Sequence, residues 1–426
     1  MRARVPRLRE LRAADRPVLE LLTFSTLFPN RAQPRHGLFV EGRLRELRTR
    51  HPVAASVIAP VPWFPFRHPR FGKYARFAQV PSGENRDGVS IRHPRYVLPP
   101  KVGMHIAPRA MALGAASAVR QTVEHASYTP VLDAHYFYPD GVAAAHLARR
   151  FGLPLVITAR GSDVNLLPEF PAVRRRMLAA GQQAAALVAV SEALARRMVD
   201  IGLPADKIHV LQNGVDLDTF RVMDRDAARA SLGLSGPVIL SVGNLLELKG
   251  HHLTIEALKQ HPGATLIIAG EGPESARLAR LASELNVASR VRFVGSVAHA
   301  ELVQYYNCAD LTVLASSREG MANVLLETLA CGTPAVVTPV GGNPEVISHP
   351  DAGVVVHERS ADALAAGVAR VLAAPPPRAA TRQQAERFAW GAVTGKLYAL
   401  LEGIASSSSA GTGRHSNDSN SIDGKI

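Results

Sequence analysis

Two carboxylates that stand eight residues apart, Glu319 and Glu327, hold the most chemical promise in this chain. An apolar run at 310–315 predicts a buried parallel strand that ends shortly before Glu319. A helix is predicted from about Met321 to Ala330, because a Gly-then-Pro stop follows it. Open α/β sheets bind ligands at the carboxyl ends of their strands, so Glu319 is expected at a ligand-binding edge.

The beginning of this predicted helix favours an anion between the two acids. Its first backbone N–H groups have no partner within the helix, and such groups bind phosphate well. Glu327, further along the helix, can accept hydrogen bonds from vicinal hydroxyls. The stretch therefore offers acceptors for two polyols with a phosphate cradle between them, which is the layout that a nucleotide-sugar requires. The residues of the cradle are Gly320, Met321, Ala322 and Asn323.

A second loop with chemical potential follows the predicted strand at 238–243. It contains Lys249, placed just before a predicted helix at 251–260, and a lysine at such a junction suits a diphosphate. The spacing of a P-loop is absent. The glycine turn at 270–272 imitates part of a dinucleotide fingerprint, but Pro273 breaks the pattern, so no dinucleotide site is expected there.

The first half of the chain repeats the arrangement of a polar residue at a strand end. His135 follows a predicted strand at 131–134 and could donate to a sugar hydroxyl or a phosphate, although a lone histidine is as often structural. Arg160 follows the next strand and could neutralise a phosphate. Asp163 beside it could equally cap a helix or stabilise a turn. Gly37 ends a basic loop that could hold an anion or be solvated.

Strands and helices alternate along the whole chain, which predicts parallel sheets with helices on both faces. A new strand-helix series begins at 238, so a boundary between two domains is expected near residue 216. The segment from Pro60 to Pro100 is expected to be a long irregular excursion, either functional or a variable surface loop.

Composition excludes several classes of protein. No run of eighteen apolar residues exists, so no membrane-spanning helix is expected. The two cysteines, Cys308 and Cys331, cannot build a disulfide framework or a cysteine metal site, and a reducing cytoplasm fits them. The Asp-x-Asp triplet at 216–218 falls in the expected linker and is discounted as a metal site. No metal ligands are predicted.

The net charge of +13 is unevenly distributed. Residues 1–220 contain 31 Lys/Arg and 17 Asp/Glu, whereas residues 221–426 contain 18 and 19. A basic surface on the first half is therefore expected to face anionic lipid or an acidic acceptor. Nucleic acid is not expected as a partner, because neither an aromatic-basic interleaving nor a known binding motif supports it.

At these motifs the chain resembles a retaining nucleotide-sugar glycosyltransferase of the GT-B fold, in glycosyltransferase family four. The resemblance extends over about residues 18–403. It is specific, because several motifs occur in order: Asn213–Asp216, the Lys249 loop, Glu319 with Glu327, Ala330–Pro334 and Gly341–Val346. Within the family, the sequences at 135–141 and 159–163 resemble those of transferases that act in cell-surface polysaccharide and teichuronic acid synthesis.

The resemblance implies an α/β fold of two Rossmann-like parallel-sheet domains that face a central cleft. It implies the following organisation: a basic N-terminal segment at 1–17, an acceptor-binding domain at 18–215, a nucleotide-sugar-binding domain at 216–385, a helix at 386–403 that crosses back to the first domain, and a disordered tail at 404–426.

The resemblance also implies roles for individual residues. Glu319 would hold the hydroxyls of the donor sugar and Glu327 those of the ribose. Lys249 would neutralise the diphosphate with help from the cradle amides. His135 would be the group of the N-terminal domain at the sugar and the reacting centre, and Gly37 would lie near the phosphates. Transfer with retention and without a required metal or other cofactor is implied.

Three departures from the family pattern concern the donor site. Asn244 stands where many members have arginine, which removes a positive charge near the diphosphate. Arg160 stands where many members have histidine, so the two changes could compensate. Met321 and Ala322 replace Phe-Pro, which should alter only packing at the sugar.

The implied substrates are broad. A UDP-sugar is the first expectation for the donor and a GDP-sugar the second, with a glycan or polyprenyl-linked acceptor at the cytoplasmic face of the membrane. The alternatives are a GT-B sugar-nucleotide epimerase or phosphorylase, and a non-catalytic protein that binds a nucleotide-sugar or glycan. A dehydrogenase is a third alternative, and the absence of a glycine fingerprint at the first strand argues against it.

Overall fold

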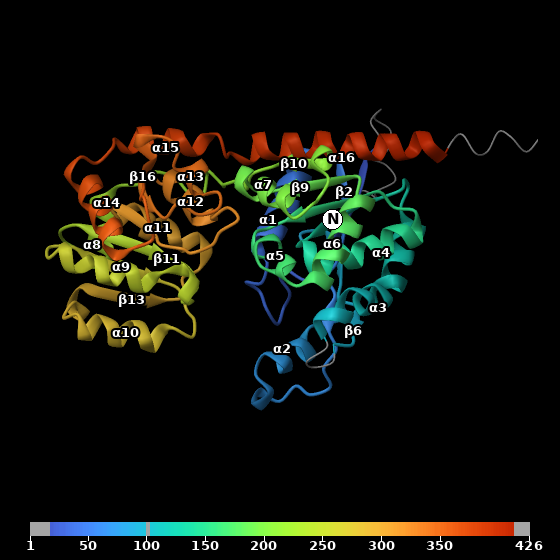
Figure 1. The fold of residues 1–426 in the computed structure, drawn as a ribbon, viewed down its shortest axis with the longest axis horizontal. Helices are drawn as coiled ribbons and strands as arrows, with labels where there is room; N and C mark the ends of the chain where they lie inside the picture. Colours follow the sequence, from blue (N-terminus) through green and yellow to red (C-terminus); the bar gives the residue numbers. More distant parts are fainter. Residues whose placement is uncertain (1–17, 99–102, 413–426) are drawn as a thin grey trace, which may run out of the picture.

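The computed structural model describes residues 18–98 and 103–412. Figure 1 shows two α/β bodies side by side, each with a sheet between helices. The predicted fold class is confirmed: both large sheets are parallel apart from one edge strand, and they are built from separate halves of the chain.

The N-terminal sheet has eight strands in the order β10-β9-β8-β7-β1-β2-β5-β4, and only β4 runs antiparallel. Strands β7, β8 and β9 are buried at every position, as expected for central parallel strands covered by helices on both faces. The strands are β1 (Leu19–Phe24), β2 (Val53–Ile58), β4 (Gly83–Arg86), β5 (Val89–Arg92), β7 (Val131–His135), β8 (Leu155–Ala159), β9 (Ala186–Ala189) and β10 (Ile208–Val210).

Six helices of the N-terminal domain follow these strands. Their lengths are set by local signals: α4, for example, ends at Gly152 in the left-handed region, and Ser191 caps the first turn of α7. The helices are α1 (Leu38–Arg50), α3 (Gly103–His125), α4 (Val142–Phe151), α5 (Ser162–Asn165), α6 (Pro171–Gln183) and α7 (Glu192–Asp200).

The C-terminal sheet has six parallel strands in the order β13-β12-β11-β14-β15-β16. The strand order reverses between β11 and β14, and this is the point where doubly wound folds bind ligands. The strands are β11 (Val238–Val242), β12 (Thr265–Ala269), β13 (Val291–Gly295), β14 (Leu311–Leu314), β15 (Ala335–Val337) and β16 (Gly353–Val355).

Eight helices accompany this second sheet. Helix α12, which holds Glu327, begins at Asn323 rather than at the predicted Met321, because Ala322 before it has an extended backbone. The helices are α8 (Arg225–Leu232), α9 (His251–Ala257), α10 (Ser275–Glu284), α11 (Leu302–Cys308), α12 (Asn323–Ala330), α13 (Asn343–Val346), α14 (Ala361–Ala373) and α15 (Arg378–Glu386).

The chain passes between the two bodies twice, and the two passages lie together. The amide of Val215 donates to the carbonyl of Phe388 at 2.9 Å, and the two segments form a short parallel bridge. After the second passage, helix α16 (Trp390–Thr412) runs along the top of Figure 1 onto the N-terminal domain. Its Leu397 and Leu401 are buried in a core cluster with residues of β1 and β7.

Helix α16 is longer than the sequence suggested. The tail from residue 404 was expected to be disordered, but the helix continues to Thr412, and residues 413–426 lie outside the described part. The predicted basic segment at 1–17 also lies outside the described residues.

Within 18–98 and 103–412, no helix combines the length and apolar character needed to cross a membrane.

The excursion at 60–100 is more ordered than predicted. It contains a two-stranded sheet of β3 (Val61–Pro62) and β6 (Arg95–Tyr96), the short helix α2 (Lys73–Gln79), and the edge hairpin of β4 and β5. These elements are short, with apolar residues at irregular spacing, and no periodic signal marked them in the sequence. In Figure 1 the part around α2 projects below the N-terminal body.

Candidate functional site

The two domains meet at the carboxyl ends of their central strands. Gly161 follows β8 and Gly320 follows β14, and here the backbones touch without room for a side chain. A Cβ atom on Gly320 would lie 2.1 Å from the carbonyl oxygen of Arg160. Helix α7 is also engaged, because the Glu345 carboxylate accepts from the amides of Glu192 at 3.0 Å and Ala193 at 2.8 Å. The two sheet edges are therefore joined by direct contacts between the domains.

Glu319 and Lys249 lie together, as the sequence interpretation requires. The Lys249 Nζ donates to Glu319 Oε1 at 2.6 Å, and Ser316 Oγ donates to the same oxygen at 2.7 Å. Gly250, with φ 71°, ends the turn that holds Lys249; a Cβ there would lie 2.1 Å from the carbonyl oxygen of Ala315. A cation and an anion are thus fixed at the ends of two neighbouring strands, β11 and β14.

The predicted phosphate cradle lies next to this pair. Met321 and Ala322 are almost fully buried, and Asn323 opens α12. Asn213, from the first passage between the domains, donates through Nδ2 to Asn323 Oδ1 at 2.9 Å and to the carbonyl of Met321 at 3.3 Å. Gly320 accepts from the amide of Gly342 at 2.9 Å. The backbone of the cradle is therefore held from both sides.

Glu327 is buried and each of its oxygens has a partner. The Tyr306 hydroxyl donates to Oε2 at 2.7 Å, and His299 Nε2 lies 2.8 Å from Oε1. The His299 ring packs edge-on against Phe220, with centroids 5.0 Å apart. The hydrogen bond to Glu327, which outweighs partial burial, raises the pKa of His299. A ribose that reaches Glu327 would have to share it with His299 or displace it.

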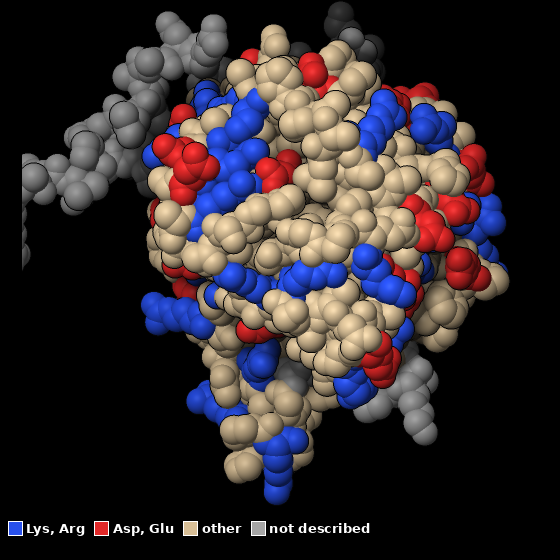
Figure 2. Space-filling view, turned by 90° about the vertical axis from the view of Figure 1, so that its left-hand side faces the viewer, with Lys and Arg blue, Asp and Glu red and all other residues tan. Residues whose placement is uncertain are grey.

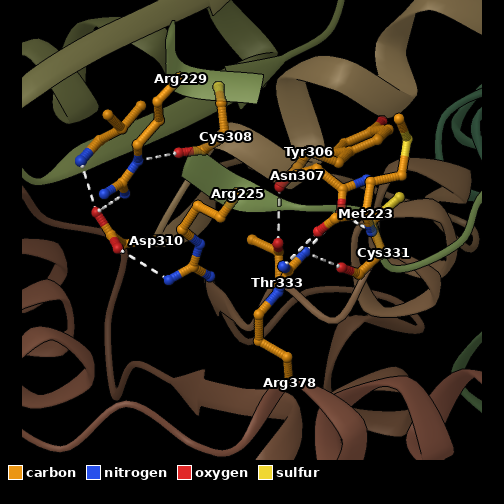
Figure 3. Close-up of polar contacts among 11 residues, drawn as sticks. Met223, Arg225, Arg229, Tyr306, Asn307, Cys308, Asp310, Cys331, Thr333 and Arg378 are labelled. Atoms are coloured by element: carbon orange, nitrogen blue, oxygen red, sulfur yellow. Dashed lines mark hydrogen bonds and ion pairs between the residues drawn. The ribbon is translucent and has the colours of Figure 1, made fainter. Parts of the chain in front are cut away.

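A polar network holds the segment that directly follows α12 (Figure 3). Arg378 donates to the carbonyl of Cys331 at 2.9 Å, directly after α12, and Asn307 Oδ1 accepts from the amide of Met223 at 2.7 Å. Thr333 Oγ1 donates to the carbonyl of Tyr306 at 2.7 Å. This network joins the C-terminal end of α11 to the segment after α12, so it helps to position Tyr306, which holds Glu327.

His135 is buried, and both of its ring nitrogens have partners within the protein. Nε2 lies 2.9 Å from Asp133 Oδ2, and Nδ1 accepts from Arg160 Nη2 at 2.7 Å. Burial, opposed by Asp133 and reinforced by Arg160, lowers the pKa of His135 to about 4. The ring is therefore neutral near pH 7, with Nε2–H donating to Asp133. A contact between His135 and a sugar stays a prediction, and it would require one of these bonds to open.

Arg160 stands between His135 and the first interdomain passage. Its Nη1 donates to Asn213 Oδ1 at 3.1 Å, and its guanidinium lies 4.9 Å above the Phe39 ring. Burial, followed by the charge of Arg43, lowers the pKa of Arg160 to about 9. Two arginines, Arg160 and Arg43, and two carboxylates, Asp133 and Asp163, thus lie close together here.

Asp163 has the contacts of a turn-forming residue. Its carboxylate is fully buried and accepts from the amides of Phe137 at 2.7 Å, Arg160 at 3.0 Å and Gly161 at 2.8 Å. Four lone-pair directions are largely used in this way, so Asp163 supports the Arg160 loop from within.

The remaining predicted residues lie in loops at the cleft. Gly37 has φ 73° and precedes α1; a Cβ there would lie 2.2 Å from the carbonyl oxygen of Leu27. Arg35 in the same loop contacts Ser296 Oγ of the C-terminal domain, so the loop spans the cleft. Asn244 is exposed after β11, and its carbonyl accepts from the amide of Leu246 at 2.8 Å.

The Asp-x-Asp triplet has a structural explanation. Asp216 accepts from the amide of Asp218 and from both the amide and the hydroxyl of Thr219, which closes a turn in the passage between domains. Across residues 18–98 and 103–412, no group of three or more His, Cys, Asp or Glu side chains could hold a metal ion. Independence from metal stays a prediction.

Two family models match the chain one after the other. The model described as Glycosyltransferase Family 4 matches residues 74–219, and the model described as Glycosyl transferases group 1 matches residues 224–388. The chain belongs to the family 4 glycosyltransferases. The second match includes Lys249, Glu319 and Glu327, and the first includes His135 and Arg160.

Curated relatives of this family 4 chain match it over a large part of its length. The D-inositol 3-phosphate glycosyltransferases of Mycobacterium tuberculosis and Mycobacterium bovis are 32% identical over 326 residues. The alignment covers 68% of this chain and 65% of each relative, so the chain spans slightly less than two thirds of their length.

Solved structures share the GT-B fold of this family 4 chain. Sucrose-phosphate synthase from Thermosynechococcus elongatus superposes with a TM-score of 0.73 at 19% identity, over 92% of this chain and 100% of that one. HepE from Anabaena, in complex with UDP-glucose, gives a TM-score of 0.66 at 20% identity, over 91% and 99%. At these identities the likeness shows the fold.

Sequence reasoning missed His299, Tyr306 and Asn213 as site residues of this family 4 chain. His299 is a single histidine in a loop before α11, and Tyr306 is an aromatic residue in an apolar helix, so neither carried a signal. Asn213 stood in a recognised motif, but nothing in the sequence indicated that its side chain reaches Asn323.

The His299–Glu327 pair is expected to make stability depend on pH. A raised histidine pKa contributes stability that is fully present below about pH 6.5 and is lost as pH rises through the raised value. Glu327 and Asp216 face the ring with negative charge and Arg45 with positive charge. His299→Gln should therefore destabilise the protein by roughly 0.2–1 kcal/mol at pH 6, with the difference vanishing towards pH 9.

Thermal unfolding of both proteins between pH 5.5 and 9 measures this effect. His357→Gln is a suitable control, because its side chain is 80% exposed. A difference between wild type and His299→Gln that is constant over the whole range would show that the ion pair contributes nothing.

Proposed function

We propose that this chain transfers a sugar from a nucleotide-sugar to a hydroxyl acceptor, with the donor held by the C-terminal domain. The observation that supports this most strongly is the Lys249–Glu319 pair at the ends of β11 and β14, beside the beginning of α12. Lys249, the amides at the beginning of α12 and the Glu319 carboxylate occupy one edge of the C-terminal sheet. Glu327 lies further along α12. These groups suit a diphosphate, a sugar and a ribose in that arrangement.

The Lys249–Glu319 contact would change when a donor binds. The diphosphate carries more negative charge than Glu319, so it would attract Lys249 Nζ. Glu319, still bonded to Ser316, would then accept from the sugar hydroxyls. In this proposal Lys249 and Glu319 hold each other in position, so that Lys249 lies where the diphosphate would bind and Glu319 where the sugar would bind.

The N-terminal domain would supply a positive charge in place of the arginine that many family members have at the position of Asn244. Arg160 lies where the backbones of the two domains touch, and the charge of Arg43 acts on it from nearby. Its place in the cleft supports the proposal that it offsets the missing charge at Asn244. His135 would act mainly by orienting Arg160, since it already accepts a hydrogen bond from that guanidinium.

Retention without a metal is proposed for the reaction. The bond between the anomeric carbon and the diphosphate oxygen breaks, the acceptor oxygen bonds to that carbon on the same face, and its proton passes to the departing phosphate oxygen. Glu319 is engaged by Lys249 and Ser316, an arrangement that favours hydroxyl binding over nucleophilic attack. NMR analysis of the product's anomeric configuration tests this, and an inverted product would contradict it.

The donor and acceptor are proposed from chemistry and likeness. HepE binds UDP-glucose and the mycobacterial relatives are named for a phosphorylated inositol acceptor. For this chain we favour a UDP-sugar, then a GDP-sugar. The acceptor would be a glycan or polyprenyl-linked molecule in cell-surface polysaccharide synthesis, at the cytoplasmic face of the membrane. Release of the protein from membranes by high salt tests the electrostatic association, and no release would contradict it.

Replacing Glu327 by Gln is expected to weaken donor binding by roughly 10- to 100-fold, because a charged acceptor contributes more than a neutral one to hydroxyl binding. Tyr306 can still donate to the amide oxygen, so folding should be retained. Titration of nucleotide by calorimetry measures the change. Glu301→Gln serves as the control, because the Glu301 side chain is exposed just before α11. Equal nucleotide affinity in wild type and Glu327→Gln would refute the role of Glu327 in binding the ribose.

Two other functions make different predictions. An epimerase or phosphorylase of the same fold would not release UDP in proportion to an added hydroxyl acceptor. A non-catalytic binding protein would release none, and the missing arginine at Asn244 is the feature that favours it. Acceptor-dependent release of nucleoside diphosphate therefore separates sugar transfer from both of these alternatives.

A further inference from the structure

The projection around α2 contains a cluster of exposed aromatic rings. Phe66 stacks on Phe71 with centroids 5.2 Å apart, and Phe64 packs against both of them and against Tyr74. Trp63, Phe66 and Tyr74 are 55%, 54% and 49% exposed. We call residues 61–80 the tip. Large aromatic side chains that remain exposed together on a projection usually mark an interaction site.

The tip has positive charge and no acid. Residues 60–83 contain four Lys/Arg and no Asp or Glu. Arg67, Arg70 and Arg76 are exposed, and the guanidinium of Arg70 lies 4.7 Å above the Phe71 ring. On the face that Figure 2 shows, the projection at the bottom of the molecule has Lys and Arg in blue among tan residues, with no Asp or Glu in red. Aromatic and basic residues are therefore interleaved here, contrary to the expectation from the sequence.

The tip is fixed to the body, so its rings have a defined position. The amide of Trp63 donates to the carbonyl of Tyr96 at 2.7 Å, and Arg95 donates to the carbonyls of Phe77, at 2.8 Å, and Val80. Strand β6 in turn packs on α3, since a Cβ on Gly114 would lie 2.4 Å from the carbonyl oxygen of Arg95.

The apolar surface continues from the tip onto the beginning of α3. Val97 and Leu98 directly after β6 are 61% and 38% exposed, and Met104 and Ile106 in the first turn of α3 are exposed as well. Residues 88–123 also contain no Asp or Glu, and Arg109 is exposed on the same helix. Exposed apolar groups and unbalanced basic groups thus share one end of the N-terminal domain.

We propose that the tip docks on an anionic phospholipid bilayer and inserts Trp63 and Phe66 among the headgroups. A convex surface of rings fits a deformable layer, where aromatic side chains are favoured at the boundary between water and acyl chains. Arginines beside them would contact lipid phosphates. The purpose of docking, access to a lipid-linked acceptor, rests on the proposed function, but binding to vesicles does not require any transfer reaction.

Sedimentation of the full chain with vesicles tests this. Wild type should bind vesicles of phosphatidylcholine with phosphatidylserine much more tightly than phosphatidylcholine alone. Arg67→Gln with Arg70→Gln should weaken binding roughly 25-fold at low salt, about fivefold for each arginine. Trp63→Ala with Phe66→Ala should weaken it by at least about tenfold and remove the part that resists high salt.

Matched controls and fluorescence separate insertion from general attraction. Arg280→Gln with Arg370→Gln removes two exposed charges from the C-terminal domain and should leave vesicle binding unchanged. The tryptophan emission should shift to the blue with anionic vesicles in wild type but not in Trp63→Phe, which should still bind. Because all tip variants keep the donor-site residues, an unchanged thermal shift with nucleotide would show that the chain is folded.

Several results would overturn the proposal. Equal binding of wild type and both tip variants would place the membrane contact elsewhere. Binding to RNA or to a soluble acidic polysaccharide that depends on the tip, without binding to vesicles, would assign the surface to that polyanion. Failure of vesicle binding together with normal donor turnover would refute docking and leave the proposed function intact.

Discussion

Replacing Lys249 by Met should lower kcat/KM for transfer by roughly 10²- to 10³-fold, because the leaving diphosphate loses its nearest cation at the moment its charge increases. The same change frees Glu319 from its 2.6 Å contact with Lys249 Nζ. An unpaired carboxylate beside the diphosphate would then repel the donor, so KM should rise as kcat falls. Steady-state kinetics with the preferred nucleotide-sugar measures both effects.

Lys259→Met is the matched control for this change. Lys259 is exposed in the short helical turn that follows α9. Its replacement therefore removes the same charge without changing the donor-site residues. If Lys249→Met retained more than half of the wild-type activity, the diphosphate would have to be neutralised elsewhere. Arg160 would then be the first residue to examine, since it is the cation on the facing domain.

Replacing Gly320 by Ala should reduce transfer about 100-fold through the fit between the domains. The added Cβ would lie 2.1 Å from the Arg160 carbonyl oxygen and 3.2 Å from the Gly161 Cα. Backbone atoms cannot give way as a flexible side chain can, so the two sheet edges must separate. Gly320 itself is not part of a hydrophobic core cluster, and thermal unfolding should therefore change little.

Small-angle scattering can detect the expected separation, because the radius of gyration should increase in Gly320→Ala. Gly263→Ala is a suitable control, since a Cβ at that position meets nothing within 4 Å. Normal activity in Gly320→Ala would show that catalysis does not use the contact between Gly161 and Gly320. An active protein with an enlarged radius would show instead that the closed arrangement is not the one in which transfer takes place.

The central strands of both sheets could be predicted from the sequence. Strands such as β8 and β12 have four apolar residues out of five, and burial on both faces leaves few other interpretations. The loops after β11 and β14 were also informative, because they contain Lys249 and Glu319 at the edge of the sheet where ligands bind. The donor half of the site was therefore predicted as a group.

The N-terminal half of the site and the tip depended on contacts that no sequence pattern encodes. His135 was predicted to face the substrate, but the structure engages it with Asp133 and Arg160, which lie two residues before it and on the next strand. The ring cluster at the tip depends on how β3 pairs with β6, more than thirty residues later. Local periodicity reports which face of an element is buried, and it does not report partners from distant segments.

The most direct test of the account is nucleotide-sugar binding by the wild type and Lys249→Met, measured as thermal shifts with a panel of UDP- and GDP-sugars. We predict that at least one nucleotide-sugar raises the unfolding temperature of the wild type, and that Lys249→Met loses most of that shift. No shift with any donor, or equal shifts in both proteins, would contradict a donor site built on Lys249 and Glu319.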